Sequence, residues 1–268
     1  MSSRPEFPIG VFDSGIGGLT VARALMQRLP HERILYFGDT ARVPYGVKSA
    51  DTIAQYAIQI ADFLLERQVK LLIVACNTMA AVAARAIRTR SPVPVLDVIE
   101  VGAHVAAQRT RNRCIGVIGT LTTVGSGAYD AAIHGHDSGI AVHSQACPLF
   151  VPLVEEGWLE HPVTLLTAKE YLTPVLAQGI DTLVLGCTHY PLLRPLLAGI
   201  AGNEVELVDS ADTTATQTAA LLSRLGLVNP GKIAPKHQFY VTDVPQRFRA
   251  VGERFLGQPL ADVEVVKW

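Results

Sequence analysis

Two cysteines in this sequence each end a short apolar run and are followed at once by side chains that form hydrogen bonds. One segment is Cys76–Thr78 and the other is Cys187–His189. A residue that ends a buried strand faces the N-terminus of the next helix, where free N–H groups stabilise a thiolate. We therefore expect both thiols to have a pKa lowered from about 8.5 toward neutrality.

Two reactive thiols in matching positions suit a proton transfer at a carbon atom. Inverting a stereocentre requires a base on one face of the carbon and an acid on the other. A hydrolase needs a single nucleophile, which would leave the second thiol without a role. The other cysteines, Cys114 and Cys147, lack the hydrogen-bonding residues that follow Cys76 and Cys187, and we expect them to be inert hydrophobic residues.

Further polar clusters follow other apolar runs, at Asp13–Gly15 and Asp39–Gly46. In an open parallel sheet, ligands bind at the carboxyl ends of the strands. We therefore expect these clusters to lie at the same edge as the two cysteines and to extend the candidate site.

Neither a dinucleotide nor a metal ion is expected at these clusters. The glycines of Gly15–Gly18 do not follow the G-x-G-x-x-G spacing, and the charge of Asp13 would repel a pyrophosphate. Cys76, Cys187 and His189 are suitable zinc ligands by type. However, the sequence contains none of the short ligand spacings that are typical of zinc sites.

The elements that must position these residues alternate between short apolar runs and longer segments of helical period. In the first part of the chain we expect strands at residues 9–12, 34–37 and 71–75, and helices at residues 19–29, 51–67 and 79–88. Strands that are apolar on both faces and alternate with helices indicate a mostly parallel sheet flanked by helices. The sequence thus predicts an α/β fold.

The same order recurs in the second part of the chain. Residues 115–118 repeat the pattern of residues 9–12, and residues 183–189 resemble residues 72–78. The distance along the chain from Ile9 to Cys76 is therefore similar to that from Ile115 to Cys187. These echoes indicate two α/β lobes related by pseudo-twofold symmetry, with the active site between them. We expect a first lobe of residues 1–97 and 209–268, completed by a helix at 211–224, a strand at 238–242 and a helix at 244–255, and a second lobe of residues 98–208.

The composition is that of a globular protein. Of 268 residues, 49% are hydrophobic and 18% charged, which is enough for one or two buried cores. The net charge of −1 gives no general attraction to nucleic acid or to an anionic membrane. No apolar run approaches the roughly 18 residues of a membrane-spanning helix, and Met1–Pro8 lacks the apolar stretch of a signal peptide. We therefore expect a cytoplasmic protein whose four cysteines are reduced thiols.

Several separated motifs carry a resemblance to a known family. They are Phe12–Val21, Pro44–Gly46, Cys147–Glu155 and Cys187–Pro191. On these motifs the sequence resembles the glutamate racemases, which are cofactor-independent enzymes of the aspartate/glutamate racemase superfamily. The resemblance extends from Ile9 to Asp209 and is loose beyond that point.

The resemblance implies how the site residues divide their roles. Cys76 and Cys187 would be the two acid/base residues, with Cys76 serving D-glutamate and Cys187 serving L-glutamate. Asp13 and His189 would assist them, and Glu155 would be a further assistant. The substrate contacts would come from Asp13, Ser14, Tyr45, Gly46, Asn77, Thr78, Thr188 and His189.

The resemblance also implies the reaction and its setting. The protein would interconvert L- and D-glutamate without cofactor or metal, and would supply D-glutamate for peptidoglycan. We further expect a homodimer that binds neither nucleic acid nor membrane. Met79 departs from the alanine that the family more often has after Cys-Asn-Thr, and we expect its side chain to point into the helix packing rather than the pocket.

Two alternatives share these features. A racemase of aspartate or another acidic amino acid would have the same fold and paired thiols, because the side chains differ by as little as one methylene. A two-lobed amino-acid-binding module would clamp its ligand between the lobes without catalysis. The paired strand-end cysteines and the absence of a signal peptide argue against the binding module.

Overall fold

The strands of the molecule form two sheets in which neighbouring strands are parallel. The computed structural model describes residues 4–260 and 262–268, so residues 1–3 of the segment Met1–Pro8, and residue 261, lie outside the described residues. The first sheet has the order β10 (Val263–Val265), β9 (Gln238–Val241), β2 (Ile34–Gly38), β1 (Ile9–Asp13), β3 (Leu71–Val74) and β4 (Val95–Asp97). The second has the order β6 (Ala141–Ala146), β5 (Cys114–Gly119), β7 (Thr182–Gly186) and β8 (Glu206–Asp209).

The two sheets share one strand order. Strands β2-β1-β3-β4 of the first sheet and β6-β5-β7-β8 of the second lie in the same order: second, first, third and fourth along their own part of the chain. The sequence prediction of two similar α/β halves is therefore confirmed. The central strands β1, β3 and β7 are buried along their whole length, as their continuous apolar runs predicted.

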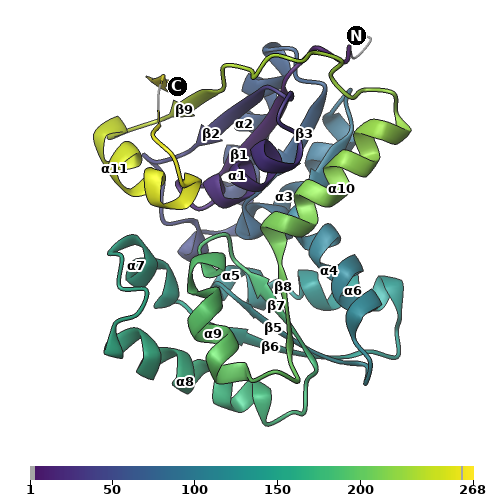
Figure 1. Cartoon of the computed structure of the whole chain (residues 1–268), viewed down its shortest axis with the longest axis vertical. Helices are drawn as coiled ribbons and strands as arrows, with labels where there is room; N and C mark the ends of the chain where they lie inside the picture. The colour runs from purple at the N-terminus through teal and green to yellow at the C-terminus, as the bar shows by residue number, and fades with distance from the viewer. Residues whose placement is uncertain (1–3, 261) are drawn as a thin grey trace.

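Helices connect the strands and cover the sheets (Figure 1). The helices of residues 1–97 and 209–268 are α1 (Leu19–Arg28), η1 (Tyr45–Val47), α2 (Ala50–Glu66), α3 (Asn77–Arg90), α10 (Ser210–Arg224) and α11 (Pro245–Leu256). Those from α4 onward in the middle of the chain are α4 (Val98–Arg109), α5 (Leu121–Gly125), α6 (Ala128–His136), α7 (Phe150–Glu155), α8 (Pro162–Leu176), η2 (Tyr190–Leu193) and α9 (Arg194–Ala201).

The C-terminal part of the chain returns to the first sheet. After β8 ends the second sheet, α10 packs against α1, and β9 then pairs with β2. We propose that residues 1–97 and 209–268 form a first lobe and that residues 98–208 form a second lobe. Figure 1 shows the first lobe above the second, with α11 above α7 at the boundary.

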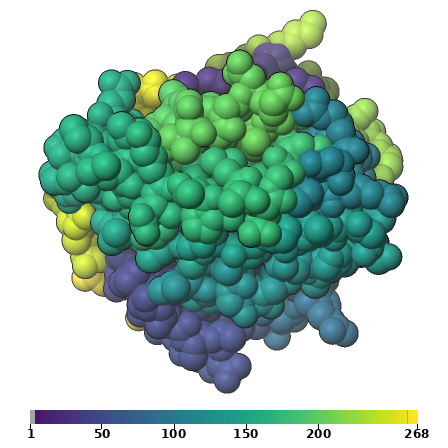
Figure 2. Space-filling view, turned by 90° about the horizontal axis from the view of Figure 1, so that it is seen from below, coloured from purple at the N-terminus to yellow at the C-terminus, as the bar shows by residue number. Residues whose placement is uncertain are grey.

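The second lobe covers most of the face seen in Figure 2, with parts of the first lobe visible around its edges. In the described part of the chain, no helix has both the length and the apolar character needed to cross a membrane.

Local sequence accounts for most element boundaries. The helix expected at 79–88 begins earlier, at Asn77, because Cys76 has the extended backbone of an N-cap residue. The helices expected at 19–29 and 51–67 agree with α1 and α2 within one residue at each end. The short edge strand β10 was not predicted, since three partly exposed residues give no clear periodicity.

Candidate active site

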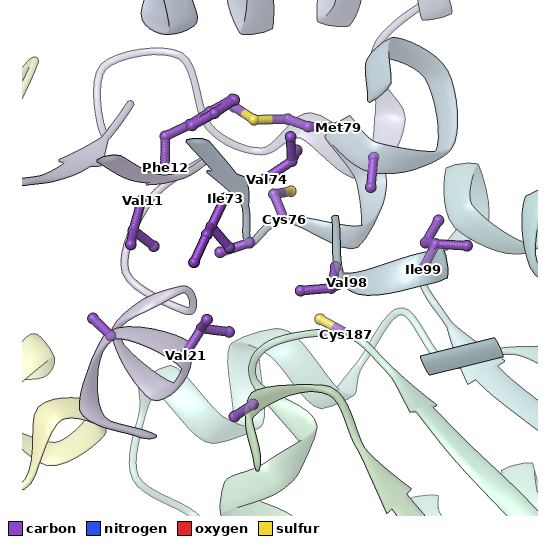
Figure 3. Close-up of a cluster of buried hydrophobic side chains, with 14 of the residues drawn as sticks. Val11, Phe12, Val21, Ile73, Val74, Cys76, Met79, Val98, Ile99 and Cys187 are labelled. Carbon is purple, nitrogen blue, oxygen red and sulfur yellow. The ribbon is translucent and has the colours of Figure 1, made fainter. Parts of the chain in front are cut away.

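Cys76 follows β3, and Cys187 follows β7. Each cysteine lies two residues beyond a strand residue that pairs with β1 in the first sheet or with β5 in the second. Val74 pairs with Phe12 in the first sheet, and Leu185 pairs with Ile118 in the second. Both thiols are almost buried, with 5% and 6% of their surface exposed. Figure 3 shows the two sulfur atoms at the ends of strands from different lobes.

The residue after each cysteine is bonded to the opposite lobe. Oδ1 of Asn77 accepts a hydrogen bond of 2.8 Å from the hydroxyl of Tyr129, in the second lobe. The carbonyl oxygen of Thr188 accepts one of 3.1 Å from Oγ1 of Thr20, in the first lobe. These reciprocal bonds bring the two cysteine-bearing strand ends to the same boundary between the lobes.

Thr78 extends this boundary. Its Oγ1 lies 3.1 Å from Oγ1 of Thr120 and 3.4 Å from Oγ1 of Thr123, both in the second lobe. Thr120 follows β5 as Ser14 follows β1, so the second lobe presents a hydroxyl at the position equivalent to Ser14. The matched spacing of the two halves is a sequence signal that could have identified Thr120.

The glycine-rich segment after β1 allows the lobes to approach closely. A Cβ at Gly17 would overlap the Thr188 hydroxyl and would lie 2.5 Å from Nδ1 of His189. Only glycine therefore fits where this loop meets the end of β7. The segment therefore serves the contact between the lobes.

Cys76 lies among groups of its own lobe. Its Sγ donates to Oγ of Ser14 over 3.5 Å, and the carboxyl group of Asp13 is close enough for its charge to act on the thiol. Burial, followed by the nearby charge of Asp13, raises the pKa of Cys76 to about 12, although the amides of Met79 and Ser14 act in the opposite direction. The sequence expectation of a lowered pKa is therefore wrong for Cys76, because desolvation outweighs the N–H groups at the start of α3.

Two buried polar atoms beside Cys76 have no hydrogen-bond partner among the described residues. They are Oδ1 of Asp13 and Nδ2 of Asn77. The other oxygen of Asp13 accepts a bond of 2.9 Å from the amide of Gly15. Burial raises the pKa of the Asp13 carboxyl. Buried polar groups are normally paired, so one free acceptor and one free donor here suit a polar ligand.

Cys187 has a different set of neighbours. Its Sγ lies 3.9 Å from Nδ1 of His189, whose Nε2 donates to Oε1 of Glu155 over 3.1 Å. Burial lowers the pKa of His189, but the hydrogen bonds with Cys187 and Glu155 outweigh it and raise the pKa to about 10. The hydrogen bond from His189 lowers the pKa of Glu155. At neutral pH the two groups form an imidazolium–carboxylate pair next to the thiol.

The element after Cys187 differs from the expected helix. A short 3-10 helix, η2, begins three residues later and leads into α9. Cys76 lies at the N-terminus of a helix, as expected, and is the N-cap of α3, whereas Cys187 is followed by η2 and faces no α-helix N-terminus directly.

Tyr45 and Gly46 lie on the first-lobe side of the boundary. The buried hydroxyl of Tyr45 donates to the carboxylate of Asp39, and the carbonyl oxygen of Gly46 accepts a bond of 2.7 Å from Thr122 in the second lobe. Met79 is fully buried, and Figure 3 draws its side chain beside Phe12, which agrees with the expected place in the helix packing.

The other two cysteines are also free thiols. Cys114 begins β5, at the opposite end of the strand from the site. Cys147 directly follows β6, so a strand-end position is not unique to Cys76 and Cys187. Its Sγ contacts the carbonyl oxygen of Gln145 at 3.6 Å, and burial raises its pKa. Within the described chain, no group of three or more potential metal-ligating side chains is present.

Sequence reasoning missed two residues of α11 that reach the site. Arg247 lies with Nη2 3.4 Å from Oε2 of Glu155, and the ring of Phe255 packs edge-on against His189 at 5.1 Å between centroids. Nothing in the local sequence of α11 indicates these contacts, since they join segments far apart in the chain.

Comparison with known proteins gives consistent matches. Residues 19–218 match the model of the Asp/Glu/Hydantoin racemase family. The chain is 64% identical to a glutamate racemase of Syntrophus aciditrophicus over 264 residues, covering 98% of each chain. It is 60% identical to a glutamate racemase of Neisseria meningitidis serogroup A, covering 97% of this chain and 96% of the other.

A solved structure matches over the same length. It is glutamate racemase from Francisella tularensis in complex with D-glutamate, with a TM-score of 0.92 and 43% sequence identity, and the match covers 98% of both chains.

Proposed function

Because this chain belongs to the Asp/Glu/Hydantoin racemase family, we propose that it interconverts L- and D-glutamate by proton transfer at Cα between two thiols. The observation that carries this proposal is the pair Cys76 and Cys187 at equivalent strand ends, each followed by a residue bonded to the opposite lobe. This arrangement suits a substrate held between the lobes with one thiol on each face of its Cα.

In the proposed reaction, one thiolate removes the Cα proton and the other thiol donates a proton to the opposite face. We assign Cys76 to D-glutamate and Cys187 to L-glutamate. Burial favours the protonated form of Cys76, which suits a proton donor. The imidazolium of His189 lies 3.9 Å from Sγ of Cys187 and can donate a hydrogen bond to that sulfur. These states suit the direction from L- to D-glutamate.

The Cα proton is a weak acid, so the site must stabilise the carbanionic transition state. Amides after Ser14, Cys76 and Cys187, together with the hydroxyls of Thr78 and Thr188, are the groups we propose for the developing enediolate. The free acceptor on Asp13 suits the substrate ammonium, and the free donor on Asn77 suits a carboxylate. Tyr45, Gly46 and His189 complete the proposed substrate contacts, while Asp13, His189 and Glu155 assist the thiols.

Substrate access requires the lobes to separate. Cys76 and Cys187 are almost fully buried, so glutamate cannot reach them while the boundary is closed. Closing the lobes around the substrate would exclude water and strengthen the polar contacts.

We further propose that the protein is cytoplasmic, because the catalytic thiols must stay reduced. We also propose that it provides D-glutamate for peptidoglycan. We also propose a homodimer. Apolar side chains are exposed on the single chain around α7 and α8, at Leu149, Trp158, Val163 and Leu166. Light scattering of the purified protein would give twice the monomer mass for a dimer, and the monomer mass would contradict this part of the proposal.

The direct test is to follow the optical rotation of L-glutamate incubated with the protein after exhaustive dialysis against EDTA. We expect the rotation to fall to zero as the racemic mixture forms. An unchanged rotation would indicate a binding module, and loss of L-aspartate rotation alone would indicate an aspartate racemase. Activity that returns only when zinc is added would contradict the two-thiol mechanism.

A further inference from the structure

Helix α11 belongs to the first lobe but reaches the second lobe with two arginines. Arg247 lies 3.4 Å from Oε2 of Glu155 through Nη2. Arg254 donates through Nη1 to the carbonyl oxygens of Val154 and Glu155, at 3.2 Å each. The two arginines are two helical turns apart and therefore lie on one face of α11. Figure 1 shows this helix above α7 at the lobe boundary.

Both arginines act on the last turn of α7. Arg254 places a cation at the C-terminus of this short helix, where the helix dipole favours a positive charge. Gly157 makes room for it, since a Cβ there would lie 2.9 Å from Nη1 of Arg254, and its φ of 78° also favours glycine. The backbone around Glu155 is thus held by a side chain of the other lobe.

The carboxylate of Glu155 is held from two sides. Oε1 accepts from Nε2 of His189, and Oε2 faces Arg247. His189 in turn contacts Cys187 through Nδ1 and Phe255 of α11 through its ring. A continuous set of contacts therefore runs from α11 through Glu155 and His189 to the thiol of Cys187.

Among the described residues, Cys76 has no hydrogen bond or ion pair with the second lobe, although the charge of His189 acts on the neighbouring carboxyl group of Asp13. Its Sγ donates to Oγ of Ser14, which directly follows β1, and the carboxyl group of Asp13, the last residue of β1, acts on it through its charge. The contacts of α11 are therefore one-sided, in contrast to the matched strand ends that carry the two thiols.

We propose that Arg247 and Arg254 are positioning residues that orient Glu155 and His189 when the lobes close, and that they serve the proton transfer at Cys187 but not that at Cys76. This inference rests on the proposed two-thiol function. Closure of α11 onto α7 completes the acid/base group on one face of the substrate only.

Racemisation rates alone cannot test this one-sided effect. The reaction has an equilibrium constant of one, so the ratio of kcat/KM for the two directions is fixed whatever a substitution does. Elimination from a glutamate that carries chloride at Cβ avoids the constraint. One thiol removes the Cα proton, chloride leaves from Cβ, and no second thiol is needed.

The experiment places R247Q/R254Q in two backgrounds, Cys76→Ser and Cys187→Ser, and measures elimination from both enantiomers of the chlorinated analogue. In the Cys76→Ser background, which relies on Cys187, we expect elimination to slow by about tenfold, because the ion pair of Arg247 and the hydrogen bonds of Arg254 should each be worth about two- to fivefold. In the Cys187→Ser background we expect less than a twofold change. The control Arg249→Gln replaces an exposed arginine of the same helix that makes no hydrogen bond or ion pair with the described residues of the second lobe, and it should leave both backgrounds unchanged.

Equal slowing in both backgrounds would show that α11 only holds the lobes together, and no slowing in either would show that Glu155 is positioned without it. Either result overturns the inference. If neither single-cysteine background eliminates chloride from either enantiomer, while the folded wild-type protein does, the two-thiol proposal itself fails, which is a separate outcome.

Discussion

Asp13 combines deep burial with an oxygen that lacks a hydrogen-bond partner among the described residues. Burial raises its pKa, so ionising this carboxyl opposes folding when the site is empty. A buried carboxylate that is kept to bind the substrate lowers the stability of the empty protein and raises its activity. The sequence marked Asp13 by its place at the end of an apolar run, but its missing partner depends on the closed boundary between the lobes.

We expect Asp13→Asn to raise the melting temperature of the empty protein at pH 8 by a few degrees and to reduce racemisation by at least about 100-fold. The sign follows from linkage. A raised folded pKa gives stability below the unfolded pKa that is lost as pH rises. The gain from the substitution should therefore shrink as the pH falls from 8 toward 4, close to the unfolded pKa of 3.8. Thermal melts at both pH values test this, and a lower melting temperature for the variant at pH 8 would contradict it.

The four cysteines should separate into two classes. Cys76→Ala and Cys187→Ala should each lower kcat by about 100-fold or more, because each removes a proposed acid/base group. Cys114→Ala and Cys147→Ala should stay within about threefold of the wild type, although Cys147→Ala removes a buried side chain and should cost about 1 kcal/mol of stability. Steady-state rates of purified, folded variants provide the measurement. Similar losses for all four would show that position does not select the thiols.

At the scale of secondary structure, sequence periodicity predicted the elements that carry the site. The apolar runs of β1, β3 and β7 and the helical spacing of α1 were sufficient, because local pattern and burial agree there. The edge strand β6 was not predicted, since its six residues include His143, Ser144 and Gln145 and are only partly buried. The contact of α11 with α7 could not be predicted, because it depends on how the lobes sit against each other.

The loop after β1 offers a test of the close approach between elements. Gly17→Ala should lower kcat/KM by more than about tenfold and destabilise the protein by about 1–3 kcal/mol, because the added methyl group overlaps Thr188 and must push β7 away. The matched control is Gly199→Ala in α9, where a Cβ meets nothing within 4 Å. This control should be neutral or slightly stabilising. If Gly17→Ala behaves like the control, the loop does not set the distance between the lobes.

At the scale of the whole molecule, hydrogen bonds between distant segments place the two lobes. Thr20 and Thr188 are bonded, as are Asn77 and Tyr129, and sequence analysis alone cannot pair such residues. The resemblance to a family indicated that Cys76 and Cys187 work together. The sequence did not indicate that their neighbours would differ so much, with a carboxyl group beside one thiol and an imidazolium–carboxylate pair beside the other.

The pair of His189 and Glu155 should make the stability of the molecule depend on pH. The pKa of His189 is raised from 6.5 to about 10, so its contribution is complete below pH 6.5 and is lost as the pH rises through 10. Melting temperatures measured from pH 6.5 to 10.5 should fall more steeply for the wild type than for Glu155→Gln, in which His189 loses its carboxylate partner. Parallel curves would mean that the ion pair does not contribute to folding.

The central claim is that two thiols act on opposite faces of one Cα. The most direct measurement is elimination of chloride from each enantiomer of the Cβ-chlorinated glutamate by the Cys76→Ser and Cys187→Ser variants. Both variants should fail to racemise glutamate. The Cys187→Ser variant should still eliminate chloride from the D-analogue and not from the L-analogue, while Cys76→Ser should do the opposite. If both variants process both enantiomers equally, one base serves both faces and the two-thiol account is wrong.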